Sequence, residues 1–369
     1  MPMRVLFALP GFHRHERGAE IALLAVAREL AECGEAVTVA GSGPVRANVT
    51  YRYWRVPSIP RERFERFPSL PAFRNETAWE DATFAASLWA RLRVSQYDAM
   101  ITCSFPFTHW ALRKPGHGTR PKQIFVTQNG DWPAVSRDAE FRLFRCDGLV
   151  CTNPDYAARN AARWNVATIP NGVTDAFRPG RPVRTRFGLP EHAQVVLMVS
   201  ALIESKRVEE GIRAVARLPG AHLVVAGDGP LRDTVLRAAA RDLPDRFTNL
   251  VVGASDMPDL YRSADAFLHM SLLESFGNVF VEAMACGLPI VGHDSERLRW
   301  IVGDIATLCD TRDEQALVAS LHSALGGAEA PCAARVARFR WPVIGAHYRA
   351  FLRATVSGTG PDARASADG

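Results

Sequence analysis

The stretch VVLMVSALIESKRVEEGIRAVARLPGAHLVVAGDG, Val195 to Gly229, holds two short apolar runs with a helical pattern between them. The runs VVLMV and HLVVA are too short for buried helices and are typical of the fully buried strands of a parallel sheet. The segment that begins at Val208 has the periodicity of an amphipathic helix. A strand, a helix and a second strand in this order predict a parallel β–α–β unit.

The same alternation recurs along the chain. In the first half, the apolar run of Arg4–Pro10 precedes a helical pattern, Ala19–Gly34, and in the second half the strand patterns NLVVGA, AFLHMS and LPIVGHD follow. Residues 169–193 are dense in Pro, Gly and Arg, which predicts a linker. We therefore predict an α/β fold with two doubly wound domains and a cleft between them. Ligands of such sheets bind beyond the carboxyl ends of the strands.

The predicted division of the chain has three parts. The N-terminal domain comprises residues 1–172 and the C-terminal domain residues 173–341. Residues 342–369 form a C-terminal helix that returns towards the N-terminal domain, followed by a small, polar tail that we expect to be disordered.

Composition narrows the class of protein. The chain of 369 residues is 47% hydrophobic and 22% charged, and no apolar run approaches the ~18 residues of a membrane helix. The apolar N-terminus is shorter than a signal peptide requires. A net charge of +5 is too small to indicate nucleic acid binding. Seven cysteines without a CxxC pair favour a reducing cytoplasm.

One lysine stands out, because 41 of the 44 cationic Lys and Arg residues are arginine. Lys206 lies in the loop after the strand VVLMV, beside Arg207 and close to a predicted helix start. Charge and free backbone N–H groups together can hold a diphosphate there. A solvated pair of cations is the alternative interpretation.

The loop AGDGPLRD carries Gly227 and Gly229, which permit a tight turn and the close approach of a ligand. The pattern is an incomplete dinucleotide fingerprint, so it is weak support for NAD, and a plain turn is the alternative interpretation.

The segment ESFGNVFVEAMACG carries two carboxylates, Glu274 and Glu282, in apolar surroundings. We expect Glu274 in a loop and a helix that begins at Asn278 and has Glu282 one turn further along the same face. The helix start offers unpaired N–H donors to a phosphate, while the carboxylates accept from hydroxyl groups. A nucleotide-sugar carries both kinds of group.

These residues carry a resemblance. Glu274 and Glu282 match the E-x7-E motif of retaining glycosyltransferases of the family 4 type, and SALIESKR, VVAGDGPLRD, MPDLYRSADAFLHMS and IPNGV resemble neighbouring segments of that family in the same order. The match is dense over residues 169–305 and loose over the first half.

The resemblance implies a GT-B architecture, in which two Rossmann-like domains face each other across a cleft. The C-terminal domain of such enzymes binds a nucleotide-sugar, the N-terminal domain binds a hydroxyl-bearing acceptor, and neither a metal nor a cofactor is needed. It implies that Lys206 holds the diphosphate, that Glu282 binds the ribose and that Glu274 faces the transferred sugar. The amides of the intervening turn surround that sugar: Phe276, Gly277, Asn278 and Val279. The departing phosphate takes the acceptor's proton, and the anomeric configuration is retained.

Several positions depart from the family pattern. Ala201 stands where the family commonly has an Arg, so Arg207 is our candidate for the second cation. Ser104 stands where many members have a His, and His109 follows five residues later. Low-ranking candidates for contact with the sugar or acceptor are these two residues and Arg17, Gln128, Asn129 and Asp131.

In the N-terminal loop HERGAE, Gly18 permits close approach to the diphosphate. His13 and His15 of the same loop have no Cys or carboxylate partner at metal-ligand spacing, so we expect no metal site.

The segment Tyr51–Arg74 interleaves aromatic residues with six arginines and two glutamates. It is a candidate for contact with an anionic membrane surface or with the acceptor, and a proline-rich surface excursion is the alternative. Other functions left open for the whole chain are an epimerase acting on nucleotide-sugars, a non-catalytic nucleotide-sugar-binding protein and, more weakly, a nicotinamide oxidoreductase. The donor nucleotide, the sugar, the acceptor and the oligomeric state are not readable from the sequence.

Overall fold

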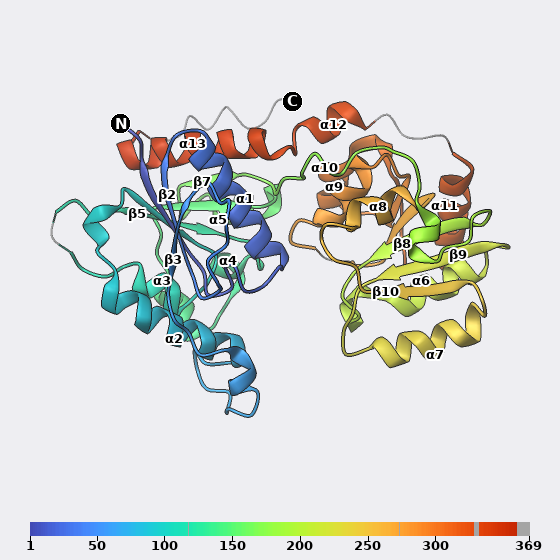
Figure 1. Cartoon of the computed structure of the whole chain (residues 1–369), viewed down its shortest axis with the longest axis horizontal. Helices are drawn as coiled ribbons and strands as arrows, with labels where there is room; N and C mark the ends of the chain where they lie inside the picture. Colours follow the sequence, from blue (N-terminus) through green and yellow to red (C-terminus); the bar gives the residue numbers. More distant parts are fainter. Residues whose placement is uncertain (117, 273, 328–331, 360–369) are drawn as a thin grey trace. The chain divides into compact units, whose positions relative to one another are not determined.

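The computed structural model describes residues 1–116, 118–272, 274–327 and 332–359, and it forms two α/β units (Figure 1). The N-terminal unit contains Met1–Asn171 and the chain from Trp341 onward, and the C-terminal unit is Gly172–Arg340. These boundaries fall one residue before the positions that the sequence predicts. The predicted disordered tail lies, from residue 360 onward, outside the described residues.

The N-terminal unit is built on a parallel sheet of seven strands in the order β3-β2-β1-β4-β5-β6-β7. Its strands are β1 Arg4–Ala8, β2 Ala36–Gly41, β3 Arg52–Arg55, β4 Ala99–Thr102, β5 Lys122–Val126, β6 Gly148–Cys151 and β7 Val166–Thr168. Its helices are α1 Gly18–Glu32, α2 Glu76–Arg91, α3 Phe107–Ala111, α4 Trp132–Val135, α5 Pro154–Asn160 and α13 Trp341–Ser357.

The C-terminal unit is built on a parallel sheet of six strands in the order β10-β9-β8-β11-β12-β13. Its strands are β8 Gln194–Val199, β9 Ala221–Ala226, β10 Phe247–Leu250, β11 Ala266–His269, β12 Ile290–His293 and β13 Thr307–Cys309. Its helices are α6 Val208–Ala216, α7 Arg232–Asp242, α8 Met257–Arg262, α9 Asn278–Ala285, α10 Glu296–Val302, α11 Glu314–Gly326 and α12 Ala333–Ala337.

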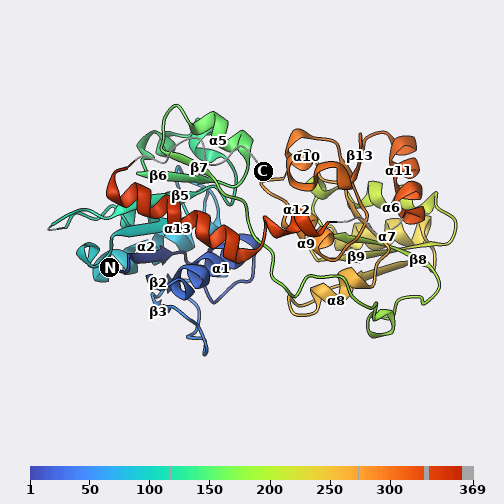
Figure 2. The ribbon, with the colours of Figure 1, turned by 90° about the horizontal axis from the view of Figure 1, so that it is seen from above.

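Both sheets are covered by helices on both faces, which explains why their strands read as continuous apolar runs. In the N-terminal unit, α1 and α13 pack together on one face, as Figure 2 shows, while α2 covers the other. Among the described residues, no helix is long and apolar enough to cross a membrane.

The strand order reverses between β1 and β4 in one sheet and between β8 and β11 in the other. The loops that leave two adjacent strands at such a point run in opposite directions and open a crevice at the carboxyl ends of the strands. In the C-terminal unit, the described parts of these loops are residues 200–207, 270–272 and 274–277, which belong to segments that the sequence marks for chemistry.

Candidate functional site

Glu274 is the centre of a charged cluster at the β8–β11 reversal. Its Oε1 atom contacts the Nζ of Lys206, which ends a 3₁₀ turn after β8, and lies 2.8 Å from Nε2 of His269, the last residue of β11. The guanidinium of Arg297, from α10, donates to the Glu274 backbone carbonyl. Sequence reasoning assigned Lys206 and Glu274 to one ligand, and the structure brings them into direct contact.

The electrostatics of Glu274 follow from these partners. Burial alone would raise the pKa of this carboxyl, but the hydrogen bond from His269 and the charge of Lys206 outweigh burial and lower the pKa to about 2. Glu274 is therefore an ionised acceptor throughout the neutral range, with its Oε1 already occupied on the protein side.

His269 is a site residue that sequence reasoning missed. Its side chain is buried, with 3% of the residue exposed, and its ring meets the ring of Phe280 edge-on at a centroid distance of 4.8 Å. The available signal was a histidine that closes the apolar strand run AFLH directly before the motif loop. A histidine at the end of a buried strand points to the carboxyl edge, where ligands bind.

Glu282 lies in a different environment from Glu274. On α9, its Oε2 accepts a hydrogen bond of 2.8 Å from the hydroxyl of Tyr261, whose side chain is fully buried. Burial raises the pKa of Glu282, and the Tyr261 hydrogen bond offsets only part of that rise. Among the described residues, no cation pairs with Glu282. This carboxylate therefore suits a partner that donates neutral O–H groups.

Between the two carboxylates, α9 begins at Asn278 and ends at Ala285, as the sequence predicts. Gly277 precedes it with φ +86°, a left-handed conformation that favours glycine, and a Cβ there would lie 2.7 Å from the Phe280 ring. No side chain caps the helix start, and a helix N-terminus favours an anion through its backbone N–H groups and dipole. The Phe276 side chain is buried in the core, which leaves its backbone amide as its possible ligand contact.

Gly227 and Gly229 have a structural role that the sequence did not reveal. A Cβ at Gly227 would lie 1.9 Å from the Ser200 carbonyl oxygen, and one at Gly229 would lie 2.6 Å from the Leu202 carbonyl oxygen. The Leu202 amide also donates to the Asp228 carbonyl. These glycines let the loop after β9 pass against the loop that carries Lys206, and their contact with a donor stays a prediction.

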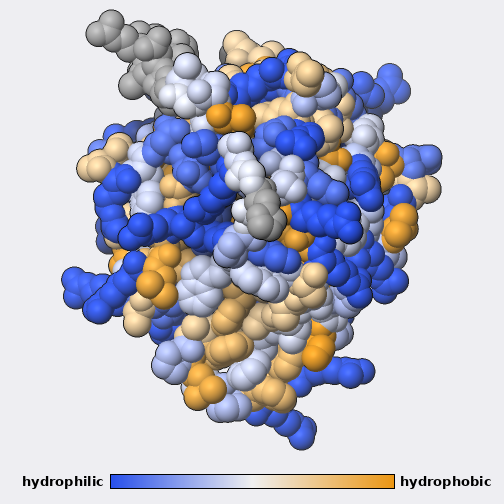
Figure 3. Space-filling model, turned by 90° about the vertical axis from the view of Figure 1, so that its left-hand side faces the viewer, coloured by the Kyte–Doolittle hydropathy of each residue, from blue (hydrophilic) through white to orange (hydrophobic). Residues whose placement is uncertain are grey.

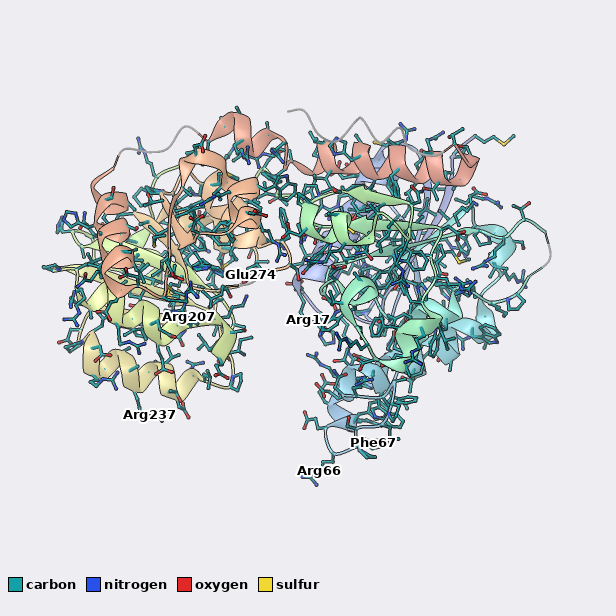
Figure 4. All side chains as sticks on the ribbon, turned by 180° about the vertical axis from the view of Figure 1, so that it is seen from behind. Arg17, Arg66, Phe67, Arg207, Arg237 and Glu274 are labelled. Atoms are coloured by element: carbon teal, nitrogen blue, oxygen red, sulfur yellow. The ribbon has the colours of Figure 1, made fainter. Side chains whose placement is uncertain are left out.

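Arg207, the candidate for the second phosphate cation, has several contacts within the protein, and its binding of phosphate stays a prediction. Its guanidinium donates to the side chain and carbonyl of Thr311 and to the Met270 carbonyl, and it pairs with Glu210 at 3.2 Å. These bonds tie together the loops that follow β8, β11 and β13, so Arg207 holds the site's frame. Figure 4 shows Arg207 and Glu274 in this unit.

In the N-terminal unit, two low-ranking candidates prove to be internal. His109 is fully buried, its Nε2 bonds the Arg145 carbonyl at 3.0 Å and its ring stacks on Phe144. Burial lowers the pKa of His109 to about 3, so it is a neutral core residue and not a ligand contact. Asp131 is 5% exposed and accepts from Arg159 and Asn160, both at 2.6 Å, which makes it a structural acceptor.

The other N-terminal candidates lie nearer the surface. Ser104 donates to the buried Asp81 at 2.9 Å, and Gln128 exchanges two hydrogen bonds with Asn171. Asn129 is exposed. Arg17 pairs with Glu20 at 3.1 Å, and Gly18 opens α1, whose start has no side-chain cap. Among the described residues, no group of three or more His, Cys, Asp or Glu side chains could hold a metal ion.

Comparison with known proteins gives two family matches. Residues 17–177 match the model of Glycosyltransferase Family 4, and residues 182–334 match that of Glycosyl transferases group 1. Among curated proteins, the lipopolysaccharide core biosynthesis glycosyltransferase LpsE of Rhizobium meliloti is 32% identical over 48% of this chain. The D-inositol 3-phosphate glycosyltransferase of Mycolicibacterium smegmatis is 37% identical over 36% of it. The matches span 52% and 33% of those proteins, respectively.

Solved structures share the architecture over almost the whole chain. Sucrose-phosphate synthase from Thermosynechococcus elongatus superposes with a TM-score of 0.74 at 20% identity, covering 96% of this chain and 100% of its own. Anabaena HepE in complex with UDP and glucose gives 0.72 at 18% identity, covering 95% and 100%. WaaG, a glycosyltransferase of lipopolysaccharide biosynthesis, gives 0.66 at 17% identity, covering 96% and 98%.

Two parallel-sheet units and these neighbours define a protein of the GT-B glycosyltransferase fold, as the sequence predicts. The two family models together match residues 17–177 and 182–334. Each model matches one of the two units, and the solved structures share the fold of the whole chain.

Proposed function

We propose that this protein is a retaining glycosyltransferase that moves a hexosyl-type sugar from a nucleoside diphosphate sugar to a hydroxyl acceptor without a metal or a cofactor. The observation that carries the proposal is the cluster of Lys206, His269 and Glu274 beside the uncapped start of α9. It offers a cation and amide donors to a diphosphate and an ionised carboxylate to sugar hydroxyls.

The division of labour follows from the chemistry of each group. Lys206 and the first amides of α9 bind the diphosphate, Glu282 accepts from the ribose hydroxyls, and Glu274 accepts from hydroxyls of the transferred sugar. The bond between the anomeric carbon and the phosphate oxygen breaks, and a bond to the acceptor oxygen forms on the same face. The acceptor's proton passes to the departing phosphate, and Lys206 and the α9 amides stabilise the charge that develops there.

The identity of the donor is suggested by relatives. Anabaena HepE was solved with UDP and glucose and also with UDP-glucose, so UDP-glucose is the first donor to test. The names of two relatives mention lipopolysaccharide core biosynthesis and D-inositol 3-phosphate, so glycolipids and small polyols are the first acceptors to test. Seven free cysteines support a reducing, cytoplasmic site of action.

The test is a thermal-shift screen of UDP-, GDP- and ADP-sugars, followed by analysis of the products with a panel of acceptors. A bound donor raises the melting temperature by mass action. We expect stabilisation by one nucleotide class and a glycosylated product with retained anomeric configuration. An epimerised sugar without transfer would indicate an epimerase, and binding without either product would indicate a non-catalytic binding protein. Either outcome contradicts the proposal.

We further propose that the segment 59–71 docks on an anionic membrane surface. It carries three exposed apolar side chains, Ile59, Phe67 and Leu70, with exposures of 44, 51 and 46%. The exposed residues Arg63 and Arg66 have no ion-pair partner among the described residues. Apolar side chains flanked by cations fit lipid tails and anionic headgroups.

The shape of this region supports the membrane proposal. Figure 4 places Arg66 and Phe67 at the end of a projection from the N-terminal unit. Figure 3, which views the left-hand side of Figure 1, shows apolar surface in the lower part of that view. The projection rests on rings: Phe67 packs on Phe64 at 5.0 Å and on Trp79 at 5.2 Å between centroids. A braced projection can present its tip to a flat surface.

Vesicle co-sedimentation tests the membrane proposal. We expect the wild-type protein to bind vesicles containing anionic phospholipid, not neutral vesicles, and R63Q/R66Q and F67S each to lose most of the binding. The matched control R232Q/R237Q removes the same charge from exposed positions of α7 and should bind normally. Equal loss in both arginine pairs would indicate non-specific charge attraction and contradict the proposal.

A further inference from the structure

His269 is fixed in place while Lys206 is free to turn. The imidazole lies at the end of β11, 4% of its side chain is exposed, and it packs against Phe267 and Phe280. The Lys206 side chain is 20% exposed and reaches Glu274 from a short turn in the neighbouring loop. A buried ring on a strand has far less rotational freedom than a four-carbon chain on a loop.

Both groups contact the same carboxylate oxygen, Oε1 of Glu274. A carboxylate only accepts hydrogen bonds, so His269 carries its proton on Nε2. The other oxygen, Oε2, has no side-chain donor among the described residues. Two donors on one oxygen therefore leave the second oxygen for a ligand hydroxyl.

Binding of a diphosphate changes the demands on Lys206. The ammonium that contacts Glu274 in the free protein is also the cation that the proposed function assigns to the diphosphate, and a doubly charged diphosphate competes with one carboxylate for it. When Lys206 turns towards the phosphate, its hold on Glu274 weakens. His269 is then the side chain that still donates to the Glu274 carboxylate.

We infer that His269 is a positioning residue that keeps the Glu274 carboxylate aimed at the transferred sugar while Lys206 serves the diphosphate. The inference rests on the proposed function for the roles of Lys206 and Glu274. It adds the role of His269 and a difference between the free and the nucleotide-bound protein. In the free protein both Lys206 and His269 hold Glu274, and in the nucleotide-bound protein His269 holds it alone.

The electrostatics of the pair agree with this geometry. Burial acts to raise the pKa of Glu274, and the His269 hydrogen bond is the largest influence that lowers it, ahead of the Lys206 contact. Loss of His269 should therefore raise the pKa of Glu274, and the rise should be largest when Lys206 has turned towards the diphosphate.

Three substitutions at His269 separate hydrogen bonding from packing. H269Q places an amide N–H at the same reach as Nε2, H269N reaches only as far as Nδ1, and H269L fills the space without a donor. The matched control is H222L, because His222 is also a buried histidine, on β9 of the same sheet but not adjacent to β11, and it bonds Thr248 Oγ1 at 2.8 Å.

Steady-state kinetics give the first readout. We expect kcat to fall about tenfold or more in H269L and H269N and to stay within about threefold in H269Q and H222L. The affinity for the free nucleoside diphosphate, measured by calorimetry, should change less than about twofold in all four, because His269 does not touch it. Equal losses in H269L and H269Q, or parallel losses of kcat and nucleotide affinity, would overturn the inference.

A second readout needs no turnover. The Glu274 carboxyl carbon, assigned by comparison with E274Q, is titrated by NMR with and without the nucleoside diphosphate. In wild type and H222L it should remain ionised at pH 4 in both states. In H269L its midpoint should rise, and rise further when the nucleotide is bound. An unchanged midpoint in H269L overturns the positioning role, even if no donor supports transfer and the proposed function itself fails.

Discussion

Glu274 and Glu282 stand eight positions apart in one motif, yet their surroundings differ. Burial acts to raise the pKa of both carboxyls, so the difference between their pKa values comes from their partners. Glu274 has two nitrogen donors on one oxygen and is held ionised, while Glu282 has one phenol, Tyr261, and stays harder to ionise. The comparison teaches that one sequence motif can supply two carboxylates with opposite electrostatic character, and we assign them opposite kinetic roles.

The largest effect should come from E274Q. The substitution keeps the shape but removes the charge, so the contact to the reacting sugar weakens where charge develops. We expect kcat to fall by about a hundredfold, with nucleoside diphosphate affinity within about threefold of wild type. If steady-state kinetics and calorimetry show that kcat and nucleotide affinity fall together, Glu274 binds the nucleotide and the contrast with Glu282 collapses.

Next in size is K206R. A planar guanidinium cannot occupy the position of a compact ammonium without moving the charge, so turnover should fall at least about tenfold. K122R is the matched control, since Lys122 lies on β5 of the other unit and has no ion-pair partner among the described residues. Near-normal kinetics in K206R would contradict the role of Lys206 in binding the diphosphate.

E282Q should weaken binding of the donor. Loss of the charged acceptor for the ribose hydroxyls should raise the dissociation constant of the nucleoside diphosphate about tenfold and leave kcat within about threefold. Calorimetry with the 2′-deoxynucleotide sharpens the test, because wild type should prefer the ribonucleotide and E282Q should not. An undiminished preference in E282Q would place the ribose elsewhere.

The smallest effects concern stability and its dependence on pH. The folded pKa of Glu274 is about 2, below its unfolded value, so its contribution is present at neutral pH and is lost as the pH falls from about 4.5 towards 2. E274Q should cost about 1–3 kcal/mol at pH 7 and less at pH 3.

Glu282 should behave in the opposite sense. Its folded pKa is raised, so the ionised form costs stability as the pH rises above the ordinary value. We expect the stability of E282Q relative to wild type, measured by urea unfolding, to be greater at pH 7 than at pH 4. The same sign of pH dependence in both variants would contradict the electrostatic contrast.

Sequence reasoning predicted the fold and much of this region. The apolar runs identified the strands, and the residue pattern identified the start of α9 at Asn278. The contact between Lys206 and Glu274 was not predictable, because the two residues are 68 positions apart and meet only since β8 and β11 are neighbours in the sheet.

Other features of the structure were not predictable, for physical reasons. Arg207 has a left-handed backbone, φ +51°, which sends its side chain to Thr311, and no sequence pattern specifies that conformation for an arginine. His109 lies on a helix of five residues, too short to show which face is buried. The sequence places His269 in an apolar strand, and its importance depends on its hydrogen bond to Glu274, which no sequence pattern specifies.

The most direct test of the account is a crystal structure of the protein with the nucleoside diphosphate sugar found in the thermal-shift screen. The account predicts Lys206 turned to the diphosphate, Glu282 within hydrogen-bonding distance of the ribose hydroxyls, and Glu274 on a sugar hydroxyl with its bond to His269 intact. A nucleotide bound away from α9, or a ribose out of reach of Glu282, would contradict it.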